Sequence, residues 1–474
     1  MTDVTNNLDP KRLEDVDGWG LSSRAPGYVF RPVNTDSICG VYSAATKSGK
    51  SIALRGAGCS YGDASINSEG IVLDLTRMNR ILEWDPQAGI ITVEPGVTIR
   101  QLWQYVIEDG WWPAVVSGTM FVTIGGAASM NIHGKNNWKV GPIGDHILRF
   151  TLLTFDGKLL ECSRETNSEL FHAAIGGFGM FGAFTSITLK MKHVSSGLIN
   201  VEAIATQNFD HLFEVFESRL DTSDYLVGWI DCFGQGNGLG RGLVHRANYL
   251  KEGEDLEPIQ TLRVANQELP DAIMGLLPKS VVWRFMQPMT NHPGVKAVNA
   301  AKFISGAKLS DGQWHTQSHA GFAFLLDYVP NWKKAYGPKG LIQYQSFIPA
   351  DAARATFKSQ LTLCQRYGIV PYLGVFKRHR EDDFLMSHAV NGYSLALDFS
   401  LGNCDRGTLL SLTAELDRTV LDSGGRFYPA KDSTLNAAAY QESLGAQTIS
   451  AFRSLKTQHD PAQIFQTNLS RRLL

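Results

Sequence analysis

Arg55-Gly-Ala-Gly-Cys-Ser-Tyr-Gly-Asp63 is the first of three glycine-rich stretches near the start of the chain, and these stretches decide the fold. The second is Gly118-Thr-Met-Phe-Val-Thr-Ile-Gly-Gly126, and the third is Gly176-Gly-Phe-Gly-Met-Phe-Gly182. Glycine permits positive φ and lets backbone N–H groups approach a ligand without a Cβ in the way. Successive N–H groups in such turns hold anions. The stretches therefore predict a phosphate-bearing ligand such as a dinucleotide cofactor, and three tight turns in a β-rich fold remain the alternative.

The bulk properties of the chain exclude several classes of protein. Its 474 residues suggest two domains. An apolar content of 43% with 19% charged residues is ordinary for a globular protein, and a net charge of −2 gives no basis for a nucleic-acid partner. The six cysteines are scattered without a Cys-x-x-Cys pair. This spacing predicts neither a zinc site nor a disulfide framework, and it favours a reducing compartment.

The sequence contains no recognisable signal or membrane-spanning segment. Residues 1–9 lack the basic start and apolar run of a signal peptide, and no long uninterrupted apolar run follows. We therefore expect a cytoplasmic location, with membrane association left open. The apolar, proline-punctuated segment 269–294 has three possible roles: a flexible lid, a surface that touches a membrane, or buried packing of an irregular loop.

The pattern of apolar and turn residues predicts an α+β fold with two parts. Turn residues at 85–89 and at Asp156-Gly157 predict two hairpins. Up to residue 196 we expect short elements, with strands at 51–55, 71–75, 80–84, 90–94 and 183–191, a hairpin over 147–161, and helices at 37–49, 98–108 and 169–175. From residue 197, longer helices at 208–219 and 350–367 alternate with aromatic-rich strands at 340–347 and 393–399. This second part predicts an antiparallel sheet with helices on one face.

Two motif matches fail on their structural context. Gly58-Cys-Ser-Tyr-Gly62 fits the G-x-S-x-G pattern of serine hydrolases, but a nucleophile elbow needs a helix straight after the turn, and residues 63–70 are loop-like. Gly177-Phe-Gly-Met-Phe-Gly182 fits the Rossmann pattern G-x-G-x-x-G, but it follows a predicted helix and opens a strand, which reverses the required order.

Polar residues after the second stretch and near the ends of later strands are the candidates for chemistry. His133 and Lys135 lie in Asn131-Ile-His-Gly-Lys-Asn-Asn137, next to whatever the second stretch binds. Gln343 and Gln345 share one face of a strand because strand side chains alternate. Lys377 and Lys431 each follow a short apolar run. Lysines at such positions usually face solvent, but if they converge on one pocket they form an electropositive site suited to a phosphate or an anionic flavin.

Taken together, these stretches resemble a known family, the vanillyl-alcohol oxidase superfamily with its PCMH-type FAD-binding domain. The resemblance is closest to the decaprenylphosphoryl-β-D-ribose 2′-oxidases, the flavin subunits of the 2′-epimerase. It rests on motifs that run in order along nearly the whole chain: Arg55–Asp63, Val122–Ala127, Ile132–Asn136, Trp229–Asp231, Ala335–Pro338, Leu341–Gln345, Val375–Lys377 and Ala430–Ser433.

The resemblance implies an FAD-binding domain over 1–196 and 424–474 and a substrate-binding domain over 197–423. Cofactor-binding positions would be Arg55, Gly56, Ala57, Gly58, Cys59, Ser60, Tyr61, Gly118, Thr119, Val122, Thr123, Gly125, Gly126, Ala128, Gly179, Phe184 and Tyr428. Catalytic positions would be His133, Lys135 and Lys431, and substrate-binding positions would be Trp229, Gln345, Lys377 and Ala396. No metal is implied. Many relatives attach FAD through a histidine where Cys59 stands here, but the ribose oxidases lack that histidine and bind FAD non-covalently. The resemblance therefore implies non-covalent FAD, with a cysteinyl link at Cys59 as the alternative.

The activity implied is oxidation of a sugar secondary alcohol, with hydride transfer to flavin N5. Lys431 would stabilise the charge of the reduced ring, and either His133 or Lys135 would take the hydroxyl proton. A separate NADH-dependent reductase would act on the keto product of a lipid-linked pentose. Ala396 stands where the ribose oxidases carry a cysteine, so cysteine-directed inhibitors should not label this chain. An alditol or aldonolactone oxidase that uses oxygen, or a catalytically silent flavin protein, remain alternatives.

Overall fold

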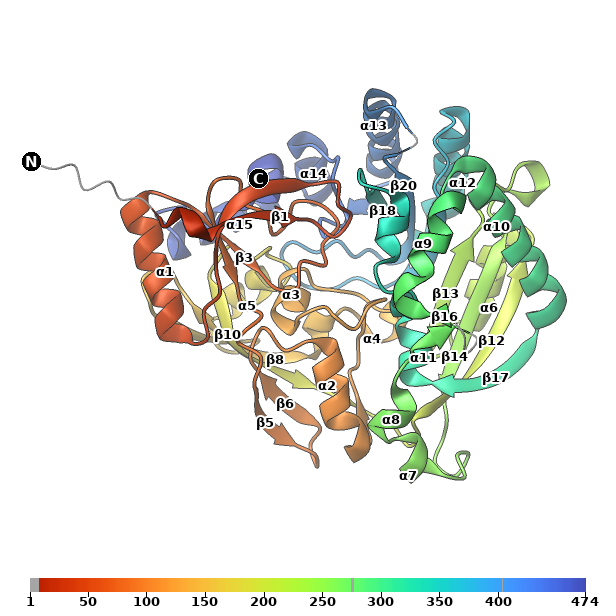
Figure 1. Ribbon diagram of the computed structural model, residues 1–474, viewed down its shortest axis with the longest axis horizontal. Coiled ribbons are helices and arrows are strands. Elements are labelled where there is room, and N and C mark those ends of the chain that lie inside the picture. Colours follow the sequence, from red (N-terminus) through yellow and green to blue (C-terminus); the bar gives the residue numbers. More distant parts are fainter. Residues whose placement is uncertain (1–7, 274–276, 403) are drawn as a thin grey trace, which may run out of the picture.

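The computed structural model describes residues 8–273, 277–402 and 404–474, and these form two lobes lying side by side (Figure 1). Both ends of the described chain lie in one lobe, which carries α1, β3, β8 and α15. The other lobe is built on a large sheet from the middle of the chain. The mixed architecture confirms the α+β fold class expected from the sequence.

A four-stranded sheet carries the first glycine stretch. Its order is β1 (Leu13–Asp17), β2 (Arg24–Phe30), β4 (Ile71–Asp74) and β3 (Ile52–Arg55), with β4 parallel to both β2 and β3. Helix α1 (Thr35–Ser48) begins at a capping box on Asn34 and buries Ile38 and Tyr42 against this sheet. Because the glycine stretch starts where β3 ends, the sheet positions it at its edge.

The second sheet of this lobe is antiparallel and five-stranded. Its order is β5 (Ile81–Asp85), β6 (Ile90–Val93), β10 (Ala183–Lys190), β8 (Ile147–Leu153) and β9 (Leu159–Ser163). The two hairpins expected at 85–89 and at Asp156-Gly157 are both present. Helices α2 (Ile99–Val106), α3 (Ile124–Ser129), α4 (Asn137–Val140) and α5 (Ser168–Ala174) complete this part, with the short strands β7 (Trp111–Trp112) and β11 (Lys192–His193).

An eight-stranded antiparallel sheet forms the other lobe. Its order is β17 (Gln313–Ser318), β12 (Leu198–Thr206), β14 (Gly242–Tyr249), β13 (Tyr225–Ile230), β19 (Leu373–His379), β20 (Gly392–Ser400), β18 (Leu341–Pro349) and β21 (Arg426–Phe427). Helices α6 (Phe209–Arg219), α12 (Ala350–Arg366) and α13 (Arg406–Asp422) lie along one face (Figure 1). Phe213 and Phe216 of α6 pack edge-on against Phe376 of this sheet. The opposite face is left to form the site.

The C-terminal helices α14 (Ala437–Leu444), α15 (Ala446–His459) and α16 (Asn468–Leu473) return to the first lobe. Residues 464–466 pair with Ile52, whose amide donates to the Ile464 carbonyl at 2.7 Å. Arg472 of α16 contacts the carboxylates of Asp63 and Asp432, each at 2.7 Å. The chain end is thereby tied to the first glycine stretch. The predicted domain boundaries stay predictions, and β21 extends the large sheet beyond residue 423.

The chain forms further helices and short strands between residues 258 and 323. They are α7 (Pro258–Thr261), α8 (Val264–Gln267), β15 (Ala272–Ile273), β16 (Leu277–Pro278), α9 (Val282–Met286), α10 (His292–Ser305) and α11 (His319–Ala323). Part of the segment 269–294, for which we considered three roles, lies outside the described residues. Its described part includes the exposed side chains of Phe285, Met286 and Met289. Among the described residues, no helix combines the length and the apolar character needed to span a membrane.

Candidate active site

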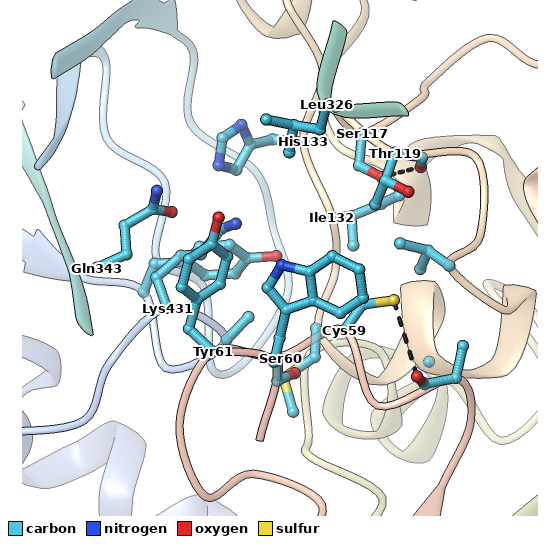
Figure 2. Close-up of a pocket in the computed structure, with 18 of the residues that line it drawn as sticks. Cys59, Ser60, Tyr61, Ser117, Thr119, Ile132, His133, Leu326, Gln343 and Lys431 are labelled. Carbon is cyan, nitrogen blue, oxygen red and sulfur yellow. Dashed lines mark hydrogen bonds between the residues drawn. The ribbon is translucent and has the colours of Figure 1, made fainter. Parts of the chain in front are cut away.

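A cavity of about 390 Å³ lies where the three glycine stretches face the free side of the large sheet. Figure 2 shows Cys59, Ser60 and Tyr61 at its floor, with Gln343 and Lys431 on one side and Thr119 and Leu326 on the other. No aspartate or glutamate is among the described residues that line it, whereas one arginine and four lysines are. The ionisable carboxylate and amine side chains among these lining residues are therefore all basic.

The first glycine stretch offers a row of free backbone donors. Among the described residues, no acceptor is found for the amides of 56–60, whereas Tyr61 N–H donates to the Ala430 carbonyl. Gly58 has a φ of +66°, which favours glycine. A Cβ at Gly56 would lie 2.0 Å from Thr123 Oγ1, so the chain can pass there only without a side chain. Consecutive unpaired amides of this kind suit an anion such as a pyrophosphate.

The second and third stretches close the cavity around the same space. Thr123 caps the N-terminus of α3, and Gly125 lies so close to Pro95 that a Cβ there would be 2.7 Å from the proline ring. Gly118 is covered by Leu326, whose amide donates to the Gly118 carbonyl at 3.2 Å. Asp327 accepts hydrogen bonds from Thr119 Oγ1 and from the Met120 amide, both at 2.8 Å. Residues 325–327 are thereby fastened over the second stretch.

The sheet face opposite the glycine stretches brings four of the predicted substrate residues together. The strand register aligns Trp229 with Val375, Val375 with Ala396, and Ala396 with Gln345. Lys377 follows two residues after Val375 and therefore points to the same side. All of these side chains line the cavity. Residues separated by more than a hundred positions in the sequence are thus placed side by side by antiparallel pairing.

All four lysines that line the cavity have lowered pKa values, and burial lowers that of Lys302 to about 8. Burial lowers the pKa of Lys135 to about 7 and that of Lys377 to about 7, and the positive charge of a neighbouring lysine acts in the same direction on each. Lys431 Nζ lies 4.1 Å from the centroid of the Tyr61 ring. Burial lowers the pKa of Lys431 to about 8, against the opposing attraction of Asp398. The site therefore holds amines that exchange protons near neutral pH.

His133 lines the cavity and belongs to a buried polar network. Its Nε2 lies 3.2 Å from the Gln345 amide nitrogen, which also donates to Ser394 Oγ at 3.1 Å, and that hydroxyl lies 2.7 Å from His379 Nε2. Burial holds the pKa of His133 well below its ordinary value, with nearby lysines acting in the same direction. His133 is therefore neutral at pH 7, and this network fixes its ring.

A second buried pair lies beside Lys431. Gln343 donates to Asp398, and burial raises the pKa of Asp398 to about 6. The side chain of Asp398 is fully buried and does not line the cavity, whereas Gln343 does. Asp398 is thus the acidic neighbour that keeps Lys431 more basic than Lys135 and Lys377.

The structure gathers almost every candidate residue around one cavity. The lining includes all of the predicted catalytic, cofactor-binding and substrate-binding residues except Ala128. Ala128 is fully buried in α3, where its carbonyl accepts a hydrogen bond from the Gly176 amide. It supports the fold of the second and third stretches instead of facing a ligand.

Several residues of the site had no distinctive signal in the sequence. His245 and Lys302 line the cavity from β14 and α10, and Leu326 covers it. Side chains alternate between the two faces of a strand, so His245 and Leu243 of β14 point to the same face of the sheet. This alternation could have indicated His245. Lys302 lies on an amphipathic helix where lysine is ordinary, so nothing in the sequence distinguishes it.

Comparison with known proteins agrees with this geometry. Residues 26–163 match the FAD binding domain family. The chain is 28% identical over 473 residues to decaprenylphosphoryl-beta-D-ribose oxidase of Mycolicibacterium smegmatis, which covers 98% of each chain. It is 26% identical over 396 residues to an uncharacterized protein of Streptomyces coelicolor, covering 80% of this chain and 100% of the other. L-gulonolactone oxidase of Bos taurus is 28% identical over 165 residues, or 35% of this chain and 37% of its own.

The residues present fit the cofactor that this family implies. A row of unpaired amides at 56–60 suits its pyrophosphate, and Lys431 beside Tyr61 provides a cation where its ring would face the large sheet. The matched family covers the first glycine stretch and the second. The chain therefore carries an FAD-binding domain over residues 26–163 and is an FAD-dependent oxidoreductase, similar over nearly its whole length to a flavin-dependent sugar oxidase.

Proposed function

We propose that this protein oxidises a secondary alcohol of a sugar to a ketone, and that its substrate is the 2′-hydroxyl of a pentose linked through phosphate to a polyprenyl chain. The observation that carries the proposal is the row of lysines on the substrate side of a cavity without a lining carboxylate in the described residues. A neutral alditol or lactone would not require that charge. The likeness to a decaprenylphosphoryl-ribose oxidase over nearly the full length supports the same substrate class.

The amides of 56–60 and the second glycine stretch would hold FAD, which would supply the redox chemistry by taking a hydride from the substrate carbon. Lys431 supplies the cation that compensates the negative charge left by this transfer, because its pKa of about 8 keeps it protonated at pH 7. His133 and Gln345 orient the substrate hydroxyl through the buried network that fixes both side chains. Trp229 and Ala396 give the sugar ring an apolar wall.

Lys135 is the better of the two candidate bases. A general base works best when its pKa lies near the operating pH, and the pKa of Lys135 is about 7. His133 has a pKa far below that range, which makes it a weak proton acceptor. Lys135 Nζ lies 4.2 Å from the centroid of the Phe322 ring and donates to the Phe322 carbonyl, and these contacts hold the amine in place. We therefore assign proton removal to Lys135.

Two partners follow from the proposal. The ketone retains the linkage of the substrate, so a separate NADH-dependent reductase would complete an epimerisation. A substrate with a polyprenyl tail resides in a membrane, which makes peripheral membrane contact part of the proposed function. The exposed apolar side chains of Phe285, Met286 and Met289 are the candidates for that contact.

The test is an absorbance spectrum of the purified protein followed by anaerobic bleaching with defined substrates. We expect a flavin spectrum that bleaches with a pentosyl phosphodiester, and a bleaching rate that rises with pH through about 7 as Lys135 loses its proton. Lys135→Met should remove that pH dependence, whereas Lys339→Met, at an exposed position, should retain it. Bleaching only by aldonolactones, with peroxide formed in air, would instead assign a lactone oxidase.

A further inference from the structure

We propose that Lys302 and His245, together with Lys377, form an anion subsite at the β14 side of the cavity that binds the phosphate of the substrate. The inference deepens the proposed function and rests on it for the identity of the alcohol. It locates the phosphate on particular side chains, two of which had no part in the chemistry assigned above.

The register of the large sheet places His245 and Lys377 on either side of one residue. His245 pairs with Val227, and Phe376 pairs with Gly228, so Lys377 is the neighbour of Val227 on the opposite strand. Val227, His245 and Lys377 all line the cavity. Because neighbouring strands are about 4.8 Å apart, the backbones of His245 and Lys377 are separated by about 10 Å. Their side chains can therefore converge on one group above Val227.

Lys302 completes this arrangement from a different element. Its Nζ lies 4.3 Å from the centroid of the Trp229 ring, one strand from His245. The base of the side chain is fixed because Phe303, the next residue of α10, packs in a cluster with Trp229 and Leu243. Lys302 lines the cavity, and part of the residue is exposed to solvent, so an anion that enters the cavity can reach the ammonium group. Burial lowers the pKa of this amine to about 8, which leaves it protonated at pH 7.

The charges at this end of the cavity have no counter-ion in the described part of the protein. No ion pair or hydrogen bond to the side chain of Lys302, Lys377 or His245 is present among the described residues, and Asp398 lies two strands away from Val227, in β20. Burial and the neighbouring lysines lower the pKa of His245 to about 4. His245 therefore offers a neutral N–H donor at pH 7, while Lys302 supplies positive charge.

The position of the subsite gives the substrate a direction. Gln345 and Ala396, where the proposed alcohol is oxidised, lie in β18 and β20, whereas His245 lies in β14. The substrate would thus lie across the strands, with the sugar toward β20 and the phosphate toward β14. A phosphate monoester and a phosphate diester both present non-bridging oxygens to Lys302, so the phosphate of either a soluble sugar phosphate or a lipid-linked sugar fits the subsite.

The test compares Lys302→Met with Lys296→Met, a matched exposed position on the same helix. Three probes are used on the FAD-bound protein: an ethyl pentofuranosyl phosphodiester, a pentose 1-phosphate and the neutral ethyl pentofuranoside. We expect Lys302→Met to raise by about tenfold the concentration of each charged probe that half-saturates anaerobic bleaching, because the loss of one charge-assisted hydrogen bond has about this effect. The half-saturating concentration of the neutral probe and the limiting bleaching rate should not change. Preference for the diester would identify the lipid-linked source, and preference for the monoester a soluble one.

Calorimetry with inorganic pyrophosphate keeps the subsite testable if none of these sugars bleaches the flavin. Binding that is weakened in Lys302→Met and in His245→Leu, but unchanged in Lys296→Met, would support the subsite even though the proposed substrate had failed. Equal affinity of all variants for pyrophosphate, or an equal loss for the charged and neutral probes, would overturn the inference.

Discussion

Lys431 is held between an aromatic ring and a buried carboxylate, and this environment suits it for charge compensation. Its Nζ lies 4.1 Å from the centroid of the Tyr61 ring, and Asp398 partly offsets the effect of burial on its pKa. Tyr61 N–H donates to the Ala430 carbonyl, which fixes the loop that carries the lysine. Among the described residues, no carboxylate acts in this way on Lys135 or Lys377, and both are correspondingly less basic.

Replacing Lys431 by methionine should slow the chemical step while leaving the fold intact. Removing one preorganised group that stabilises developing charge typically lowers a rate by about 10²-fold or more. We expect a loss of this size in the limiting rate of anaerobic bleaching, together with a shifted flavin spectrum. Lys339→Met at an exposed site is the control. A bleaching rate and spectrum equal to those of the unaltered protein would show that Lys431 has a different role.

At the level of single residues, the sequence predicted side chains that follow recognisable strands. Lys377 and Gln345 could be assigned to the site because strand alternation fixes their facing once the strand is recognised. Lys302 and Asp398 could not, because their relation to the cavity depends on how α10 and β20 pack against distant strands. The resemblance implied that Ala128 binds the cofactor, but this residue of α3 is buried in the protein core.

Among the elements, the junction between β3 and α3 is sensitive to side-chain size. Gly56 follows β3, and its Cα faces the side chain of Thr123, which caps the first turn of α3. A methyl group at Gly56 would displace Thr123, the cap of the helix that lines the cofactor side of the cavity. Two glycine stretches are thus coupled through one contact.

We therefore expect Gly56→Ala to yield folded protein with much less FAD. Displacement of Thr123 removes an N-cap, worth about 1 kcal/mol, and moves the row of free amides at 56–60. The measurement is the ratio of flavin to protein absorbance after purification. Gly40→Ala is the control, because Gly40 lies in α1 with open space around its Cα, and this variant should keep its flavin. Full flavin content in Gly56→Ala would contradict the assignment of this stretch.

The elements themselves were predicted well where the signals are local. Turn residues fixed both hairpins of the five-stranded sheet, and apolar periodicity located α1, α6 and α12. The order of the eight-stranded sheet was out of reach, because β13 pairs with β19 and β12 pairs with β17 across more than a hundred intervening residues. Such pairings depend on the whole chain and leave no local pattern.

At the scale of the whole molecule, the apolar patch and the proposed phosphate subsite lie on the same lobe. Phe285, Met286 and Met289 are 66%, 40% and 44% exposed, and α10, which carries Lys302, begins at His292. Arg284 and Lys334 are also exposed nearby, since α9 packs against residues 332–336. Exposed apolar side chains flanked by basic ones are typical of surfaces that dip into anionic membranes. A lipid-linked sugar could then enter the cavity from that surface.

We accordingly expect the protein to co-sediment with vesicles that contain phosphatidylserine, and less so at high salt because ions screen the basic groups. Phe285→Ser combined with Met289→Ser should lower the vesicle affinity by about tenfold or more, since each buried apolar side chain contributes about 1.5–3 kcal/mol. Leu159→Ser is the matched control, because Leu159 is 55% exposed but belongs to β9 in the other lobe. Equal vesicle binding by both variants would show that this patch does not contact the membrane. Bleaching by a water-soluble pentosyl phosphodiester should be unchanged in the double variant, because the patch acts on delivery of a lipid-linked substrate and not on its oxidation.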